Sequence, residues 1–310
     1  MPGTNTVNYV TQFERELMQK YRRELMTAEM TTENVRFINA NTVKIPFIEL
    51  AGYKDHSRNG GFNRQAVKND FQTFVLKFDR DVEFFVDQMD VDESNNALIA
   101  ANVTNEFEEQ QAIPETDCYR ISKCYAEYKE AGGTPNTTTL TNENVLSIID
   151  TAMMAMTEAE VPLEGRILYV TPTVEKMINE AKEIQRYINL TQNSGNVNRK
   201  VVNLDGLKIK PILSARMKTI YDFSDGYKGG TNAKQINMIL FHPKSLLACD
   251  KHQYIKLWPE GTHTQGDGYL YQNRKYGDLF VIPNRVEGIF INAEAEAVPE
   301  KPSQGDGDSE

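Results

Sequence analysis

The acidic stretch Asp90–Asn95 is the first candidate for metal chemistry in this sequence. An EF-hand calcium loop needs a glycine at its sixth position and a bidentate acid at its twelfth, and these positions hold Asn95 and Ala101. The shorter Asp90-x-Asp92 pattern could instead hold a metal ion in a nucleotide-sugar transferase. Acids at the start of a helix are stabilised by the helix dipole without any metal. We therefore interpret the stretch as a helix start and keep a metal-dependent transferase as an alternative function.

Three histidines and a cysteine form a second group of possible metal ligands: His242, Cys249, His252 and His263. The histidine spacings of ten and eleven residues match no zinc pattern, and no Cys-x-x-Cys pair accompanies them. We expect these histidines to be hydrogen-bonded structural residues or surface residues. The cysteines Cys118, Cys124 and Cys249 are predicted to be buried thiols.

A cluster of glutamates, Glu106, Glu108 and Glu109, has residue types suited to acid–base chemistry. Paired carboxylates act as acid and base when an apolar environment raises one pKa. The sequence offers no such environment, so we predict a solvated acidic face. The Gly-x-Ser-x-Gly elbow and the Gly-Lys-Ser end of a phosphate-binding loop are also absent from the sequence. We therefore predict no catalytic residue, no cofactor and no enzymatic activity.

The composition is that of a globular protein with an acidic balance. Of the 310 residues 40% are hydrophobic, and 44 acidic against 34 basic residues give a formal charge of −10. This charge disfavours binding to phosphates, so such a chain would enclose DNA rather than bind it. No apolar run reaches the roughly 18 residues that span a bilayer, and the polar N-terminus lacks the order of a secretory signal. We expect no membrane association and a location in a cytoplasm.

The elements that would position these residues are a long strand and a long helix. Apolar alternation predicts one strand over Phe71–Gln88, and helical spacing then continues as far as Lys129. A helix over Ser94–Lys129 would be roughly 50 Å long. Pro114 lies within it and should either kink the helix or restart it from a first turn that contains the proline. Elements of this length suit a subunit that reaches other subunits better than a compact pocket enzyme.

A long hairpin with a polar tip precedes the helix. Thr42–Leu50 is predicted to be a strand, and Pro46 restricts this strand to an edge or an isolated ribbon. The run Asn59-Gly60-Gly61 predicts the turn, and Phe71–Gln88 returns. A lone hairpin is marginally stable in water, so we expect it to lie on another surface. Ahead of it, apolar spacing predicts a charged helical arm over Tyr9–Met30.

Beyond a glycine-bearing boundary at Ala131–Asn136, helices and strands alternate, which indicates a mixed α/β domain. Two helices are predicted, one capped by Thr141 and one opened by Thr171-Pro172. Strands or hairpins are predicted at Ile167–Val170, Val201–Leu213, Ile236–Phe241, Tyr254–Leu257, Tyr269–Arg274, Leu279–Ile282 and Gly288–Ile291. The tail Ala293–Glu310 holds six acids and one lysine, cannot bury a core and is predicted to be disordered.

The order of these parts and several short motifs resemble one known family. The motifs are Asp79–Val82, Asp87–Glu93, Pro114–Arg120, Val170–Pro172, Phe241–Lys244 and Gly288–Phe290. In order and spacing they are similar to the tailed-bacteriophage major capsid proteins of the Hong Kong 97-type fold, over nearly all of residues 35–292. The resemblance implies an α+β fold that begins with an N-terminal arm at 1–39 and an extended loop at 40–80. A peripheral domain would follow at 81–133 and 251–292, with a spine helix at 94–129. An axial domain would occupy 134–250, and a disordered acidic tail would occupy 293–310.

The same resemblance implies a function. The chain would be the major head-shell protein of a tailed phage, forming pentamers and hexamers of an icosahedral shell around double-stranded DNA. It would assemble in the bacterial cytoplasm and end in the virion. About forty residues precede the first strand, too few for the scaffolding extension of some relatives, so a separate scaffolding protein is implied, as is a portal. An encapsulin-like bacterial compartment, which encloses cargo protein, is the alternative within this fold.

Opposite charges suggest how neighbouring subunits meet. The hairpin tip carries Lys54 and Arg58 beside the turn Asn59-Gly60-Gly61, and the long helix carries Glu106, Glu108 and Glu109. We predict that the tip of one subunit docks on the helix of the next, because complementary charges steer and register a repeated contact.

Overall fold

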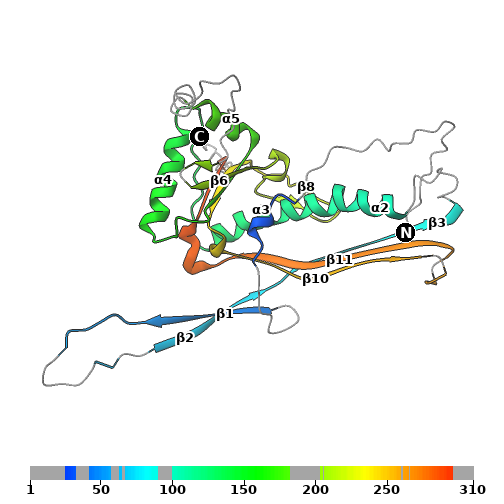
Figure 1. The fold of residues 1–310 in the computed structure, drawn as a ribbon, viewed down its shortest axis with the longest axis horizontal. Helices are drawn as coiled ribbons and strands as arrows, with labels where there is room; N and C mark the ends of the chain where they lie inside the picture. The colour runs from blue at the N-terminus through cyan, green and yellow to red at the C-terminus, as the bar shows by residue number, and fades with distance from the viewer. Residues whose placement is uncertain are drawn as a thin grey trace, which may run out of the picture. The chain divides into compact units, whose positions relative to one another are not determined.

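The computed structural model in Figure 1 describes residues 25–32, 42–56, 63–64, 67–89, 100–181, 203–204, 206–259, 261–264 and 266–295. The chain divides into two compact units. The first draws on Met30–Glu108 and Leu247–Phe280, and the second on Arg23–Glu29, Glu109–Leu246 and Val281–Glu310. The two units are defined by contacts within this chain. The predicted boundaries of the peripheral and axial domains therefore stay a prediction.

A two-stranded antiparallel ribbon forms part of the first unit (Figure 1). Strand β1 (Thr42–Leu50) pairs with β2 (Val67–Val75), from Thr42 opposite Val75 to Leu50 opposite Val67. The predicted strand, its bounds and its isolation as a ribbon are confirmed. Pro46 is accommodated because each strand of a two-stranded ribbon has an edge that makes no ladder hydrogen bonds.

The prediction of a single strand over Phe71–Gln88 is wrong. The chain leaves β2 at Val75 and starts β3 (Phe78–Asp87), which belongs to a different sheet. At the break, Leu76 is buried and the Lys77 amide donates to Asp278 Oδ2 at 2.9 Å. The apolar alternation runs through the break unchanged, so only the change of partner ends the strand.

A three-stranded sheet in the order β10-β11-β3 is the main sheet of the first unit. Strand β10 covers Leu246–Trp258, and β11 covers Gly268–Val281 and runs antiparallel to β3. The two strands predicted at Tyr269–Arg274 and Leu279–Ile282 are therefore one strand. Gly277 lies in the middle of β11, where a Cβ would come within 2.7 Å of the Cys249 carbonyl oxygen. The glycine thus permits close strand packing rather than ending a strand.

The long helical segment has a wide turn near its middle. Helix α2 (Ala100–Phe107) leads into a π turn (Glu108–Ala112), and α3 (Ile113–Glu130) follows with Pro114 in its first turn. The predicted restart at the proline is confirmed, because the missing amide of Pro114 interrupts the α-helical hydrogen bonds. The predicted beginning, residues 94–99, lies outside the described part of the chain. The predicted arm helix is described only at its end, where Ala28–Met30 forms a 3₁₀ helix instead of an α-helix.

A five-stranded sheet, in the order β12-β9-β4-β6-β5, lies in the second unit. Its strands are β12 (Ile289–Ala293), β9 (Ile236–Phe241), β4 (Ile167–Val170), β6 (Leu207–Pro211) and β5 (Asn203–Leu204). The predictions for β4 and β9 are confirmed residue for residue, and the hairpin β5–β6 turns at Gly206 as expected. Strand β12 pairs antiparallel with β9. Ala293 ends this strand and is buried, so the predicted disordered tail does not begin there.

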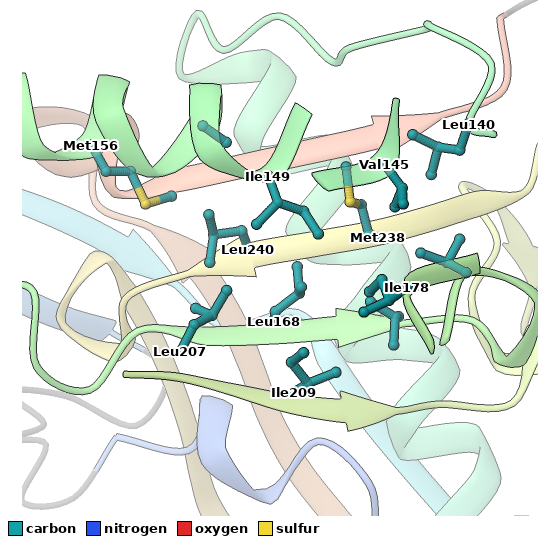
Figure 2. Packing of buried hydrophobic residues seen from close by; sticks show 13 residues of the cluster. Leu140, Val145, Ile149, Met156, Leu168, Ile178, Leu207, Ile209, Met238 and Leu240 are labelled. Atoms are coloured by element: carbon teal, nitrogen blue, oxygen red, sulfur yellow. The ribbon is translucent and has the colours of Figure 1, made fainter. Parts of the chain in front are cut away.

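Two helices bury one face of this sheet. Helix α4 (Val145–Glu158) and helix α5 (Pro172–Glu180) contribute Val145, Ile149, Met156 and Ile178 to a core with residues of β4 and β9. Figure 2 shows Met156 and Ile149 directed toward Leu240 and Leu168. The predicted cap of α5 is confirmed, since Thr171 Oγ1 accepts from the Val174 amide. The predicted cap of α4 by Thr141 is wrong: Asn144 is the N-cap residue, and Thr141 Oγ1 accepts from the Asn144 amide in the turn before the helix.

The remaining elements are short. They are β7 (Tyr221–Asp222), β8 (Lys228–Gly229) and the 3₁₀ helices Ser214–Arg216, Pro243–Ser245 and Pro283–Gly288. Among the described helices, none is both long and apolar enough to cross a bilayer.

Candidate assembly surfaces

The ribbon β1–β2 exposes large apolar side chains. Ile48, Leu50, Val67 and Phe71 keep between 53% and 72% of their surface accessible. Toward the Thr42–Val75 end of the ribbon, Val43 is buried and the Phe74 ring lies 5.1 Å from that of Phe280. Burying apolar surface is worth roughly 25 cal/mol per Å², so this row of side chains favours contact with another surface.

The tip of the ribbon carries one described residue of the predicted contact set. Lys54 is exposed, and so is its neighbour Tyr53. The two sides of the tip approach each other where Asn63 Nδ2 donates to the Asp55 carbonyl oxygen at 3.0 Å. Arg58 and the turn residues Asn59, Gly60 and Gly61 lie outside the described residues.

The three predicted helix acids are not equivalent. Glu108 is half-buried, and its Oε1 accepts from the Tyr271 hydroxyl at 3.0 Å and from Asn273 Nδ2. The prediction of a fully solvated acidic face is therefore wrong for Glu108. Glu106 is also half-buried, and Glu109 is exposed. Among the three, Glu109 is the acid that a neighbouring subunit could reach most directly.

Phe107 explains why Glu108 faces the sheet. Its ring packs 5.2 Å from Phe84 of β3 and 6.1 Å from Tyr271 of β11, so α2 covers this face of the three-stranded sheet. Burial raises the pKa of Tyr271 to about 12, and the Glu108 carboxylate adds to the shift. The phenol therefore stays a hydrogen-bond donor to Glu108 at all ordinary pH values.

The opposite face of the same sheet is polar and ordered. Trp258 Nε1 donates to Gln272 Oε1 at 3.0 Å, and Gln272 Nε2 donates to Glu83 Oε2 at 2.6 Å, so one row crosses β10, β11 and β3. Arg274 binds Asp79 through two bonds of 3.0 and 2.6 Å and lowers the pKa of that carboxyl group. This face is therefore held in a defined arrangement of charges.

A buried acid in the second unit anchors the end of the arm. Asp117 of α3 is completely buried and accepts from the amides of Met26 and Thr27, from the Thr27 hydroxyl, and from Arg216 Nη1 at 2.6 Å. Arg120 Nη1 donates to the Thr27 carbonyl oxygen at 3.1 Å. Sequence analysis did not identify this cluster. A usable signal was present, because Asp117 and Arg120 place charges among the apolar residues of a helix that must be buried.

A second acid anchors the same segment to the five-stranded sheet. Glu29 accepts from Lys210 Nζ at 2.7 Å, Tyr169 Oη at 3.0 Å and Lys208 Nζ at 3.1 Å. Burial alone would raise the pKa of Glu29, but the hydrogen bonds from Lys210, Lys208 and Tyr169 outweigh it and lower the pKa to about 2.

Of the candidate histidine ligands, His242 and His263 have hydrogen-bond partners, and His252 is exposed. His242 Nδ1 accepts from the Lys244 amide at 3.1 Å, and His263 Nε2 lies 2.9 Å from the Gly268 carbonyl oxygen. The three cysteines are buried as predicted, and burial raises the pKa of Cys118 and Cys124 to about 12. Asp90 and Asp92 lie outside the described residues.

No protein-family model matches the chain, and no curated protein matches it in sequence. Solved structures do match. The capsid of the cyanophage P-SCSP1u is 12% identical with a TM-score of 0.70, covering 93% of this chain and 94% of that chain. The mature capsid of bacteriophage PhiM1 is 16% identical with a TM-score of 0.68, covering 94% and 93%. The head of the Helicobacter pylori bacteriophage KHP40 is 10% identical with a TM-score of 0.62, covering 92% and 95%. The chain therefore has the α+β, Hong Kong 97-type fold of phage capsid structures, as the resemblance of its motifs implied.

Proposed function

We propose that this protein is the major capsid protein of a tailed bacteriophage. The observation that carries the proposal is the extent of the structural match, which covers more than nine-tenths of both chains in each comparison above. Because the match spans nearly the whole length of each chain, the likeness concerns a whole shell subunit rather than one shared domain.

Assembly is the activity that this fold would serve. Copies of the chain would form pentamers and hexamers that close into an icosahedral shell, with a separate scaffolding protein and a portal as partners. The exposed apolar side chains of β1–β2 support this proposal, because burying them against a neighbouring subunit would be favourable. With a formal charge of −10 the shell would enclose double-stranded DNA without binding its sequence. In this role the protein is a structural component of the virion and not an enzyme.

Negative-stain microscopy tests the proposal directly. The purified protein, alone and co-expressed with its scaffolding protein, should form capsomer rings or hollow particles. A folded protein that stays monomeric at high concentration under both conditions would overturn the proposal. Particles recovered after nuclease treatment from infected cells should also contain protected double-stranded DNA. Particles that contain cargo protein and no nucleic acid would instead establish the encapsulin-like compartment.

A further inference from the structure

The two outer strands of the three-stranded sheet differ in charge. Strand β3 carries the acids Asp79, Asp81, Glu83 and Asp87 against one base, Arg80. Strand β10 carries two lysines and no acid after Asp250, over the sequence Lys-His-Gln-Tyr-Ile-Lys-Leu-Trp. Because these are the end strands on opposite sides of β11, the sheet has one acidic edge and one basic edge.

The basic edge is also apolar and open to solvent. Tyr254, Ile255 and Leu257 keep between 37% and 47% of their surface accessible, with Tyr254 on one face of β10 and Ile255 and Leu257 on the other. A long end strand with exposed apolar side chains on both faces is a template for pairing with another chain. The beginning of the same strand does accept such a segment, since the Thr32 amide donates to the Ala248 carbonyl oxygen at 2.9 Å.

Both edges are held in place before any partner arrives. The Lys256 ammonium lies 3.3 Å from the centre of the Trp258 ring, and Trp258 is tied through Gln272 to Glu83. On the other edge Arg274 fixes Asp79, while Asp81 is exposed. Ordered side chains lose little conformational entropy on binding, which favours association.

We propose that the β10 edge of one copy, His252–Trp258, docks against the β3 edge of a second copy, Asp79–Glu83. A contact between two β10 edges would oppose lysines to lysines, and a contact between two β3 edges would oppose acids to acids. Only the mixed contact pairs opposite charges. Such a head-to-tail contact leaves one edge of each kind free on the outer copies, so further copies can add, and the assembly closes into a ring when the rotation between copies permits it. The inference rests on the proposed function and specifies one surface through which the capsomer would form.

Cysteine cross-linking tests which edges meet. The native cysteines are buried, so the variants Asp81→Cys and Lys256→Cys each add one reactive thiol. A mixture of the two variants, treated with a short bis-maleimide, should give cross-linked dimers in denaturing gels, while each variant alone should give monomers. Dimers from Lys256→Cys alone would show a contact between two β10 edges and overturn the proposal. The experiment is done on particles, or on concentrated protein if no particles form. If the mixture gives no dimers, the proposal is also overturned.

Charge exchange provides a second readout. Asp81→Lys alone and Lys256→Asp alone should each lower particle yield at low salt at least tenfold, and the double variant should recover most of the yield. Lys228→Glu, which reverses another exposed lysine, is the matched control and should assemble normally. The proposed edge contact would be refuted if both single variants assembled normally. It would also be refuted if the particle yield of the double variant were no higher than that of either single variant. If wild type forms particles in that experiment, the proposed function stands independently of this result.

Discussion

Asp117 and Arg216 form a buried ion pair, with 2.6 Å between Asp117 Oδ2 and Arg216 Nη1. Asp117 is on helix α3, Arg216 lies in a 3₁₀ helix of the same compact unit, and the carboxylate also accepts two backbone amides of the arm. The acid thus holds together a helix, a loop and an arm that are far apart in sequence. Its removal would leave a buried guanidinium without a counter-charge.

The variant Asp117→Asn should therefore be strongly destabilised. Loss of one partner of a buried ion pair costs about 3–5 kcal/mol, because the remaining charge stays desolvated. Urea unfolding of the unassembled protein measures this change in free energy. Glu109→Gln, which neutralises an exposed acid, is the control and should change the free energy of unfolding by less than about 0.5 kcal/mol. Equal stability of the two variants would show that the cluster does not anchor the arm.

Acid should weaken the attachment of the arm through Glu29. Its pKa is about 2 in the folded protein and 4.5 ordinarily, so the folded state favours the ionised form. This contribution is fully present above pH 4.5 and is lost as the pH falls from there toward 2. Allowing for solvent around Lys208, we expect a loss of about 1–2 kcal/mol in the free energy of unfolding. Glu29→Gln should show a flatter pH dependence in that window, and an unchanged slope would contradict the assignment.

The ribbon tip should act between subunits. Reversing Lys54 and Arg58 to glutamate should leave the melting temperature of the unassembled protein unchanged while particle yield collapses. Each exposed pair is worth only about 0–1 kcal/mol, but a closed shell repeats the contact many times. Wild type at high salt should show the same defect, because salt screens the contact. Lys44→Glu, an exposed lysine on the same ribbon away from the tip, is the matched control. Normal assembly of the double reversal would exclude the tip from the interface.

The acidic C-terminal segment should be dispensable for folding, provided that a truncation leaves strand β12 intact. The Ala293 amide donates to the Asn136 carbonyl oxygen at 3.0 Å, and the Glu294 amide donates to the Gln235 carbonyl oxygen at 2.9 Å. Truncation after Ala295 should leave the thermal melt within error of wild type. Truncation after Asn292 should cost about 1 kcal/mol or more, because it removes the buried Ala293 and two backbone hydrogen bonds to the half-buried Asn136 and Gln235. A shorter chain that melts as well as the longer one would show that Ala293 contributes nothing.

Local patterns predicted most of the elements. The bounds of β1, β4 and β9 followed from apolar alternation or short apolar runs ended by turn residues, and the start of α5 followed from Thr171-Pro172. These signals lie within a few residues of the elements they define, so one sequence is enough to find them.

The errors arose where a distant residue decides the outcome. The strand break at Lys77 depends on Asp278, and the orientation of Glu108 depends on Tyr271 and Asn273. No spacing rule connects residues so far apart in sequence. Of the predicted contact set, the structure describes Lys54 and the three glutamates, and their part in assembly stays a prediction.

The π turn at Glu108–Ala112 has a mechanical consequence. One of the points at which the chain passes from one compact unit to the other falls between Glu108 and Glu109, inside this turn. A π turn departs from the regular α-helical hydrogen bonds, and Pro114 removes one more donor just beyond it, whereas α2 and α3 on either side are regular. In the shell proposed above, this irregular turn between two regular helices is a place where the backbone of the subunit could adapt to neighbours in different positions.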